Sequence, residues 1–391
     1  MRKSTLFVFI LSLLSLSCGV QQPEYDYQQP EKINDGLEVG TLEEVGIDSR
    51  YIGDAVRDID RGKYGEIHAL LVCKDGKLAL EEYFEGHKYQ WEAPRHHGEW
   101  ISWKKEMLHD IKSVSKSITS ACIGITIDKG FIESVHQSIF DYLPDHQHLK
   151  TGGKEKITIE HMLTMTSGLE WDEWGVPLSS AKNDIIGLWF HCDDQIECIL
   201  ERPLVSEPGS SFTYSGGNTI VLGEIIKNAT QLDIEEFSKK YLFEPLDVDT
   251  CSWSVRYPSG IIESGGGLDI TPRAMLKVGV TFLNHGVWNG KQVVSEEWVD
   301  KSALSFPPNR RINVPGEDTG RNGYSYSWWI NDINISGKKT SIFYGSGWGG
   351  QKIIVMPGQN AVIVFTGGNY TSKVKEFKIL KRYIIPAFEN G

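Results

Sequence analysis

Strand-like runs lie near both ends of this 391-residue chain, so one sheet can draw on both ends. Near the N-terminus, residues 67–73 and 77–84 are rich in apolar residues and flank Lys74-Asp75-Gly76. An Asp-Gly pair between two such runs is typical of a β-hairpin. Three further runs, joined by turns that contain Gly or Pro, lie near the C-terminus at residues 340–344, 352–356 and 361–366. We therefore expect an antiparallel sheet of five or more strands that both chain ends complete.

Helical patterns account for much of the remaining chain. A helix that begins at Asp48-Ser49 and a final amphipathic helix at about residues 373–385 could pack on the sheet. The middle, about residues 130–265, has four shorter helix signals, at residues 158–164, 184–190, 219–229 and 234–241. The expected fold class is therefore α+β, with helices flanking the sheet and a mainly helical region inserted into it. A cleft between the sheet and this region is the natural place for a ligand.

Composition narrows the class of protein. Hydrophobic residues make up 40% of the chain and charged residues 24%, which is ordinary for a globular protein. The length suits one large enzyme fold, which we assign to residues 41–391. The formal net charge is −12 at pH 7. Because nucleic acids and anionic membranes attract positive charge, we expect no nucleic-acid partner, and membrane contact only through an anchor.

Residues 1–17 have the pattern of a secretory signal peptide. Two basic residues precede an apolar run at residues 6–16, which as a helix would be only about 16 Å long and too short to cross a membrane. Residues 15–19, Ser-Leu-Ser-Cys-Gly, resemble a bacterial lipobox. We therefore expect an exported protein of the cell envelope, lipidated on Cys18, with residues 18–40 as a flexible tether. A plain secreted protein is the alternative.

Six cysteines are present, and setting Cys18 aside leaves an odd number. An odd number argues against a disulfide framework, although Cys192 and Cys198 are near enough in sequence for one local bridge. No Cys or His pair has the spacing of zinc ligands, and we interpret His96 and His97 as a surface pair without a third ligand nearby. We predict no metal and no cofactor, and make no prediction of the oligomeric state.

Ser113 and Lys116 are the first candidates for chemistry. The Ser-x-x-Lys pattern occurs five times in this chain, so alone it is weak. Only at Ser113 does it open a long, mostly apolar helix, which Lys129-Gly130 then ends. Residues three apart share a helix face, and the free N–H groups at a helix start favour a developing anion. A serine needs a base to become a nucleophile, and Lys116 could serve if its pKa is lowered. The alternative is a capping serine with a solvated lysine.

Tyr214 is the second candidate, in the stretch Tyr214-Ser215-Gly216-Gly217-Asn218. A tyrosine that faces a cleft beside a cationic lysine can share its proton and act as a base. The alternative is a core tyrosine in a Gly-rich turn.

The third candidate is the segment Gly345, Ser346, Gly347 and Trp348. Glycines beside a strand let a substrate approach main-chain N–H groups, which can bind an oxyanion. The glycines also fit the dinucleotide-binding pattern, but a strand rather than a helix follows, so we reject that interpretation. No Gly-x-Ser-x-Gly elbow is present, which argues against an α/β-hydrolase fold.

Taken together, these stretches are similar to the serine β-lactamase and penicillin-binding-protein superfamily. Its class C-like branch of esterases, D-aminopeptidases and 6-aminohexanoate-dimer hydrolase is the most similar part. The resemblance extends over about residues 45–390, and the markers stand in the family's order. They are residues 109–117, 157–169, 207–215, 265–268 and 288–290.

The resemblance implies roles for the candidates. Ser113 would be the acylated nucleophile and Lys116 its proton partner, while Tyr214 would act with the lysine and help activate the deacylating water. Backbone N–H groups of Ser113 and Trp348 would hold the oxyanion. The implied activity is hydrolysis of an ester or amide bond in a small molecule or peptide, without a cofactor.

Two departures from the family's motifs bear on the substrate. Gly216 stands where the second motif usually has Asn, and Gly345 where the third usually has Lys or His. In β-lactamases and transpeptidases that cation helps to hold a substrate carboxylate. Three hypotheses remain: a serine hydrolase for another ester or amide, a non-catalytic ligand-binding envelope protein of the same fold, and a true β-lactamase or D,D-peptidase.

Overall fold

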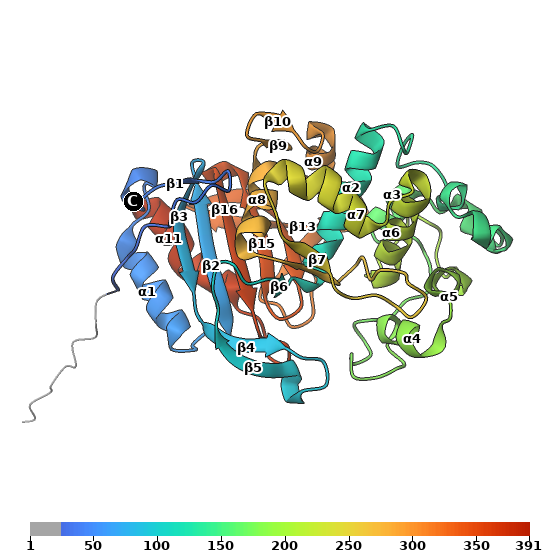
Figure 1. Cartoon of the computed structure of the whole chain (residues 1–391), viewed down its shortest axis with the longest axis horizontal. Coiled ribbons are helices and arrows are strands. Elements are labelled where there is room, and N and C mark those ends of the chain that lie inside the picture. The colour runs from blue at the N-terminus through green and yellow to red at the C-terminus, as the bar shows by residue number, and fades with distance from the viewer. Residues whose placement is uncertain (1–24) are drawn as a thin grey trace, which may run out of the picture.

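The computed structural model describes residues 25–391, and its centre is a nine-stranded sheet (Figure 1). The predicted signal peptide at residues 1–17 and the lipidation site Cys18 lie outside the described residues. The strand order is β1-β3-β2-β16-β15-β14-β13-β12-β11. All neighbouring strands are antiparallel except β1 (Glu38–Val39), which runs parallel to β3 (Lys77–Tyr83).

The prediction that both chain ends complete one sheet is confirmed. Strand β2 (Ile67–Lys74), from the N-terminal hairpin, pairs with β16 (Ala361–Gly367), the last strand of the chain. The other two predicted C-terminal strands are β14 (Lys338–Gly347) and β15 (Gln351–Met356). Along β2, Leu71 contributes to the core on one face of the sheet and Val72 to the core on the other. Both faces are covered, so this strand is apolar throughout.

Three strands at the other side of the sheet were not predicted. Strand β12 (Arg321–Ser325) and strand β13 (Trp328–Ile335) form a hairpin, and the short β11 (Ile312–Asn313) lies beyond them. The two turn residues, Tyr326 and Ser327, both have positive φ. Such turns usually contain Gly, Asn or Asp, so this sequence gives no turn signal.

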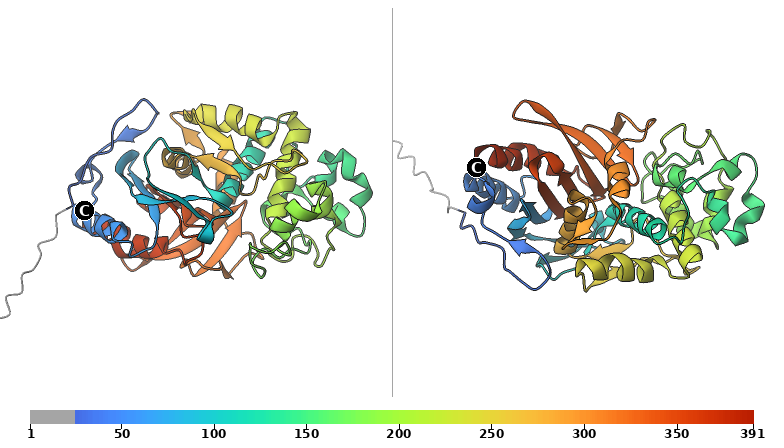
Figure 2. Two further views of the ribbon diagram at one scale, coloured as in Figure 1. Left: turned by 60° about the horizontal axis from the view of Figure 1, so that its bottom comes forward. Right: turned by 90° about the horizontal axis from the view of Figure 1, so that it is seen from above.

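Helices cover both faces of the sheet (Figures 1 and 2). Helix α1 (Ser49–Asp60) begins after Asp48, as predicted, and packs with the C-terminal helices on one face. The C-terminal helix starts at Glu376 rather than residue 373 and consists of α10 (Glu376–Ile379), a π-helical turn (Leu380–Ile384) and α11 (Ile385–Asn390). Helices α8 (Pro272–Leu283) and α2 (Ser115–Asp128) lie on the opposite face, and the helical region lies beyond α2.

The helical region contains the four predicted segments, one further α-helix and several 3-10 turns. The predicted segments are α3 (Ile159–Leu163), α4 (Asp184–His191), α6 (Gly216–Thr230) and α7 (Ile234–Ser238), the last continued by a π-helical turn (Lys239–Phe243). Helix α5 (Gln195–Glu201) was not predicted. A disulfide joins Cys192, after α4, to Cys198 in α5, which is the local bridge the spacing allowed.

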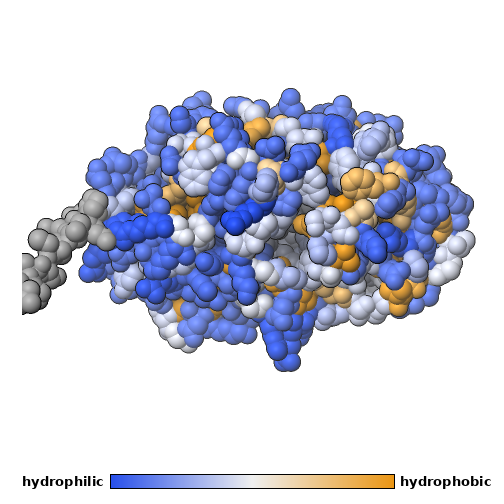
Figure 3. Space-filling model, turned by 90° about the horizontal axis from the view of Figure 1, so that it is seen from below, coloured by the Kyte–Doolittle hydropathy of each residue, from blue (hydrophilic) through white to orange (hydrophobic). Residues whose placement is uncertain are grey.

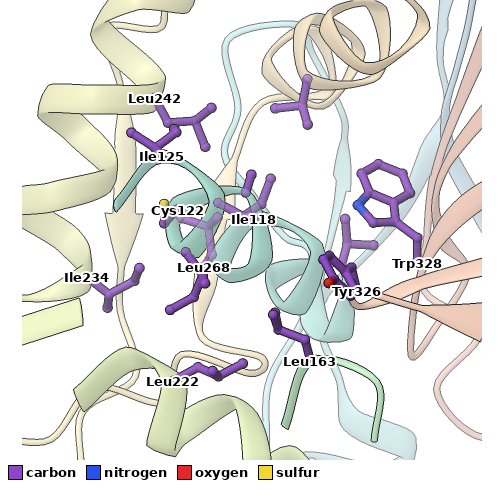
Figure 4. Packing of buried hydrophobic residues seen from close by; sticks show 14 of the residues in the cluster. Ile118, Cys122, Ile125, Leu163, Leu222, Ile234, Leu242, Leu268, Tyr326 and Trp328 are labelled. Carbon is purple, nitrogen blue, oxygen red and sulfur yellow. The ribbon is translucent and has the colours of Figure 1, made fainter. Parts of the chain in front are cut away.

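Helix α2 runs between the sheet and the helical region and is buried from Ser115 to Thr126. The sequence pattern indicated one apolar face, but the helix is enclosed on all sides. In Figure 4, apolar side chains from both parts lie around it: Leu222, Ile234 and Leu242 from the helical region, and Tyr326 and Trp328 from the side of the sheet. This packing fixes the start of α2 relative to the sheet.

Residues 25–40, which fall within the tether predicted for residues 18–40, lie against the sheet, and residues 18–24 lie outside the described residues. Tyr27 donates a hydrogen bond to the carbonyl of Ala79 (2.8 Å), and Leu37 is buried. Residues Glu38 and Val39 then form β1 at the sheet edge. The aromatic and aliphatic side chains of this segment gain apolar contacts by lying on the sheet, so it is part of the folded domain. Within residues 25–391, no helix has both the length and the apolar character needed to cross a membrane.

Candidate active site

A cavity of about 690 Å³ opens between the sheet and the helical region. Figure 3 views the molecule from the side of α4 and of the hairpin β4 (Glu85–Tyr89) and β5 (His97–Ser102); it shows a hollow with hydrophobic residues at its border. Six of the seven predicted catalytic and oxyanion-binding residues line the cavity: Ser113, Lys116, Tyr214, Ser346, Gly347 and Trp348.

Ser113 lies in a 3-10 turn (Lys112–Val114) that leads directly into α2. Asp110 positions this turn because its carboxylate accepts the backbone N–H of Lys112 (3.0 Å), a residue with left-handed φ. The hydroxyl of Ser115 donates to the carbonyl of Lys112 (2.6 Å), which holds the turn against the first residues of the helix. Ser113 therefore lies at the start of the helix, as predicted. It is in the 3-10 turn, and α2 follows from Ser115.

Lys116 lies one turn after Ser113, with its ammonium group in the same hollow. Its Nζ donates to Ser113 Oγ (3.1 Å) and to the carbonyl of Gly265 (2.8 Å). Only 4% of the residue is exposed. A solvated lysine beside a capping serine, the alternative interpretation, does not fit this geometry.

Tyr214 lies just before α6 and faces Lys116. The Lys116 Nζ is 5.0 Å from the centre of the tyrosine ring. Burial raises the pKa of the Tyr214 phenol strongly, the charge of Glu173 adds to this, and a hydrogen bond with the Ser113 side chain lowers it. The ring stacks on Trp174 (4.9 Å between centroids), so aromatic contacts fix its orientation.

Gly345 is the predicted site residue that does not line the cavity. A Cβ atom on Gly345 would lie 3.2 Å from Ser117 Oγ and 3.3 Å from a methyl carbon of Val114, so this glycine faces α2. Side chains alternate along a strand, and Ser346 therefore faces the cavity. A Cβ atom on Gly347 would lie only 2.3 Å from the carbonyl oxygen of Ile111, so the end of β14 closely approaches the segment that carries Ser113.

Comparison with known proteins identifies the family. The family model named Beta-lactamase matches residues 68–378. The chain belongs to the β-lactamase family. The resemblance inferred from the motifs is thereby confirmed.

Individual relatives agree with this assignment. The chain is 27% identical over 264 residues to 6-aminohexanoate-dimer hydrolase from Paenarthrobacter ureafaciens, which covers 66% of this chain and 65% of that protein. It spans a smaller share of other curated relatives. A solved structure from Bacillus anthracis, provisionally given the same hydrolase name, superposes with a TM-score of 0.65 at 20% identity, covering 93% of this chain and 90% of that one.

A family VIII carboxylesterase structure has a TM-score of 0.65 at 14% identity and covers 88% of this chain and 97% of its own. At these identities the solved structures show the fold alone. The chain spans less than two thirds of the length of the curated relatives it matches, and the family assignment rests on residues 68–378.

The structure adds a cation that the motif comparison missed. Family members usually carry Lys or His at the start of the third motif, where this chain has Gly345. Here Lys352 pairs with Ser346 across β14 and β15, and its Nζ donates to Ser346 Oγ (2.7 Å) and to a Glu317 carboxylate oxygen (2.9 Å). A lysine in a mainly apolar strand was the available sequence signal. Since Glu317 neutralises it, this lysine is not free for a substrate carboxylate.

Acidic residues also line the cavity. They are Glu92, Asp110, Glu173, Glu263 and Glu317, against two lysines, Lys112 and Lys116. Glu173 accepts hydrogen bonds from the backbone N–H of Gly216 (2.6 Å) and from the indole of Trp171 (2.7 Å). Burial raises the pKa of Glu263 to about 7, against the charge of Lys116, which lowers it. These residues come from separate segments of the chain, so no sequence motif predicted that they would meet in the cavity.

Proposed function

We propose that this protein hydrolyses an ester or amide bond through an acyl-enzyme on Ser113. The observation that carries the proposal is the 3.1 Å contact between Lys116 Nζ and Ser113 Oγ inside the cavity, with the Tyr214 phenol facing both. Acyl transfer needs the hydroxyl proton of the nucleophile to pass to a nearby base, and both Lys116 and Tyr214 are hydrogen-bonded to Ser113. Ser113 Oγ attacks the carbonyl carbon, and its proton passes to the Lys116–Tyr214 pair.

The same pair completes the reaction. When the carbon–leaving-group bond breaks, the leaving group takes the proton, and Ser113 remains acylated. Water then attacks the acyl carbon and gives one proton to the pair. The bond between the acyl carbon and Ser113 Oγ breaks, and the pair returns the proton to the serine. Main-chain N–H groups at Ser113 and Trp348 stabilise the two oxyanions; such donors typically supply about 3 kcal/mol each.

The lining of the cavity points to the substrate class. Carboxylates outnumber lysines there, and Lys352 is already paired with Glu317. A substrate carboxylate, as in β-lactams and D-alanyl peptides, would meet no free cation beside Ser346. Aromatic rings from Tyr89, Trp174, Trp189, Trp329 and Trp348 also line the cavity. We therefore assign a small ester or amide, neutral or amine-bearing, with an apolar acyl part.

A substrate panel tests the proposal. Purified protein is assayed on neutral esters, linear amides, D-amino-acid amides and a chromogenic cephalosporin, with Ser113→Ala as the matched variant. Turnover of esters or amides that Ser113→Ala abolishes supports the proposal. Rapid cephalosporin hydrolysis would instead indicate a true β-lactamase, and no turnover of any compound would indicate a ligand-binding protein.

We further propose that the protein is exported and held in the cell envelope by a lipid on Cys18. The support is the signal-peptide pattern of residues 1–17 and the Cys192–Cys198 disulfide, since disulfides persist mainly in oxidising compartments. Metabolic labelling with a radioactive fatty acid should label the wild type and not Cys18→Ala. Unlabelled, released wild-type protein would favour the plain secreted alternative.

A further inference from the structure

A cluster of histidines surrounds one carboxylate outside the active-site cavity. Glu66 directly precedes β2, His87 lies in β4 and His97 in β5, and one ligand atom from each lies within 4.8 Å of the others. His87 Nδ1 is 2.9 Å and His97 Nδ1 3.6 Å from Glu66 Oε1. The two imidazole rings are stacked, with centroids 4.2 Å apart. The three residues are half-buried, so solvent can reach them.

Hydrogen bonds assign the tautomer of His97. Its Nε2 lies 3.1 Å from the carbonyl oxygen of Gly368, which can only accept, so Nε2 carries the hydrogen. In the neutral ring the lone pair is then on Nδ1, the atom that faces Glu66. A lone pair directed at a carboxylate is repulsive, so either a proton on Nδ1 or a metal cation between the two groups has to compensate it.

A second histidine presents the same feature. His109 Nδ1 donates to the carbonyl of Asp110 (3.2 Å), so its Nε2 accepts from His68 Nδ1 (2.8 Å). This leaves the lone pair of His68 on Nε2, which is 3.5 Å from Glu66 Oε2. His68 is fully buried, and its Nε2 has no hydrogen-bond partner within the described part of the chain.

Two glycines leave the room that this cluster needs. A Cβ atom on Gly86 would lie 2.4 Å from His68 Nε2, and one on Gly368 would lie 2.9 Å from Glu66 Oε2. Any other residue at these positions would displace the rings or the carboxylate. The backbone therefore forms a cradle around Glu66 from two sides.

We propose that Glu66, His87 and His97 bind a divalent transition-metal ion, with zinc as the best match, and that His68 Nε2 lies beside it. Imidazole nitrogen and carboxylate oxygen are common zinc ligands. The hydrogen bond from His97 to the Gly368 carbonyl is the outer contact that orients ligating histidines. The three residues come from positions 66, 87 and 97, so no compact motif marks them; this is why His97 had no visible third ligand in the sequence.

The position of the ion defines its role. It ties the β4–β5 hairpin to the start of β2 and, through His97, to the chain after β16. Tyr89, Trp91 and Glu92, at the end of β4 and in the connection to β5, line the active-site cavity, whereas Glu66, His87 and His97 are not among its described lining residues. The ion therefore stabilises one wall of the active site without touching the substrate.

Metal titration of the purified full chain tests this proposal. After dialysis against a chelator, Zn²⁺ is titrated against a chromophoric competitor, and melting temperature is recorded with and without Zn²⁺. We expect one ion per chain with a dissociation constant of about 1 µM or lower and a higher melting temperature with zinc. Co²⁺ should give visible d–d bands without a thiolate charge-transfer band, because no cysteine takes part.

Variants locate the ion. His97→Ala and Glu66→Gln should weaken zinc binding at least about tenfold, and His87→Gln serves if either fails to fold. His285→Ala is the matched control, since this exposed histidine also lies 3.5 Å from a glutamate, Glu296. Ser113→Ala should bind zinc normally, which separates this proposal from the catalytic one. Binding weaker than about 100 µM, or binding unchanged in the ligand variants, would mean that the cluster is only a histidine–carboxylate hydrogen-bond network and would overturn the proposal.

Discussion

Lys352 Nζ lies 2.7 Å from Ser346 Oγ, across two neighbouring strands at the edge of the cavity. The lysine side chain is fully buried, and the carboxylate of Glu317 neutralises it at 2.9 Å. The site thus contains a cation near the third motif, but an internal ion pair holds it.

Glu317→Gln should destabilise the fold by about 3 kcal/mol, because it leaves Lys352 buried without its main counter-charge. Urea unfolding at pH 7 measures the change. The double variant Glu317→Gln/Lys352→Met should recover part of the loss, since it removes the unpaired charge. A surface pair provides the control: Glu297→Gln, which frees exposed Lys301, should cost less than about 1 kcal/mol. Equal effects of the two single variants would show that burial of the Lys352 pair has no energetic consequence.

The protonation of Glu376 should make the stability of the fold depend on pH. Burial raises the pKa of this carboxyl to about 7, and Lys352 lowers it in part. The folded state therefore keeps the proton while the unfolded state loses it near its ordinary pKa of about 4.3. The contribution of this group to the free energy of unfolding is fully present below that pH. It falls as the pH rises to 7, by about 3 kcal/mol in total. Glu376→Gln should remove this part of the slope between pH 5 and 8, as urea denaturation at each pH would reveal. A variant whose slope matches the wild type would contradict the assignment.

Lys116→Ala and Tyr214→Phe should each lower kcat/KM for a good ester by about 10²–10⁴-fold, because each removes part of the proton relay. Steady-state kinetics measures the loss, and circular dichroism checks the fold. Thr119→Ser, one turn along α2 and away from the cavity lining, is the matched control and should retain near wild-type kinetics. Wild-type turnover in Tyr214→Phe would remove the phenol from the mechanism.

Gly347→Ala should lower kcat/KM by at least about tenfold, because its methyl group would push the end of β14 away from Ile111 and so from Ser113. Gly358→Ala is the comparison, since its Cβ would meet only a Thr340 methyl carbon, at 3.0 Å. Kinetics on the same ester separates the two variants. If both behave alike, the close approach at residue 347 does not matter for catalysis.

Much of the fold could be predicted because its signals are local. The Asp75-Gly76 turn and the apolar runs beside it define the β2–β3 hairpin, and three more apolar runs supply β14 to β16. The hairpin turn at Tyr326-Ser327 escaped notice because its residues adopt positive φ without the usual Gly or Asn. The packing of residues 25–39 on the sheet was not predicted either, because the segment is mainly polar and only a few of its side chains contact the sheet.

The active site, too, could be predicted from the sequence only in part. The relation of Ser113 to Lys116 follows from helical spacing, and Tyr214 from the resemblance to the family. Lys352 and Glu317 could not be found, because cross-strand pairing and loop packing bring them to Ser346. The Glu66–His87–His97 cluster is likewise created only by the packing of the β4–β5 hairpin on β2.

The central claim is that Ser113 is the nucleophile, and covalent labelling tests it most directly. Folded protein is treated with a fluorophosphonate, and the adduct is mapped by peptide mass spectrometry. We predict one adduct per chain, on Ser113, that is lost in Ser113→Ala and strongly slowed in Lys116→Ala. A folded wild type that stays unlabelled, or an adduct on another residue, would contradict the account.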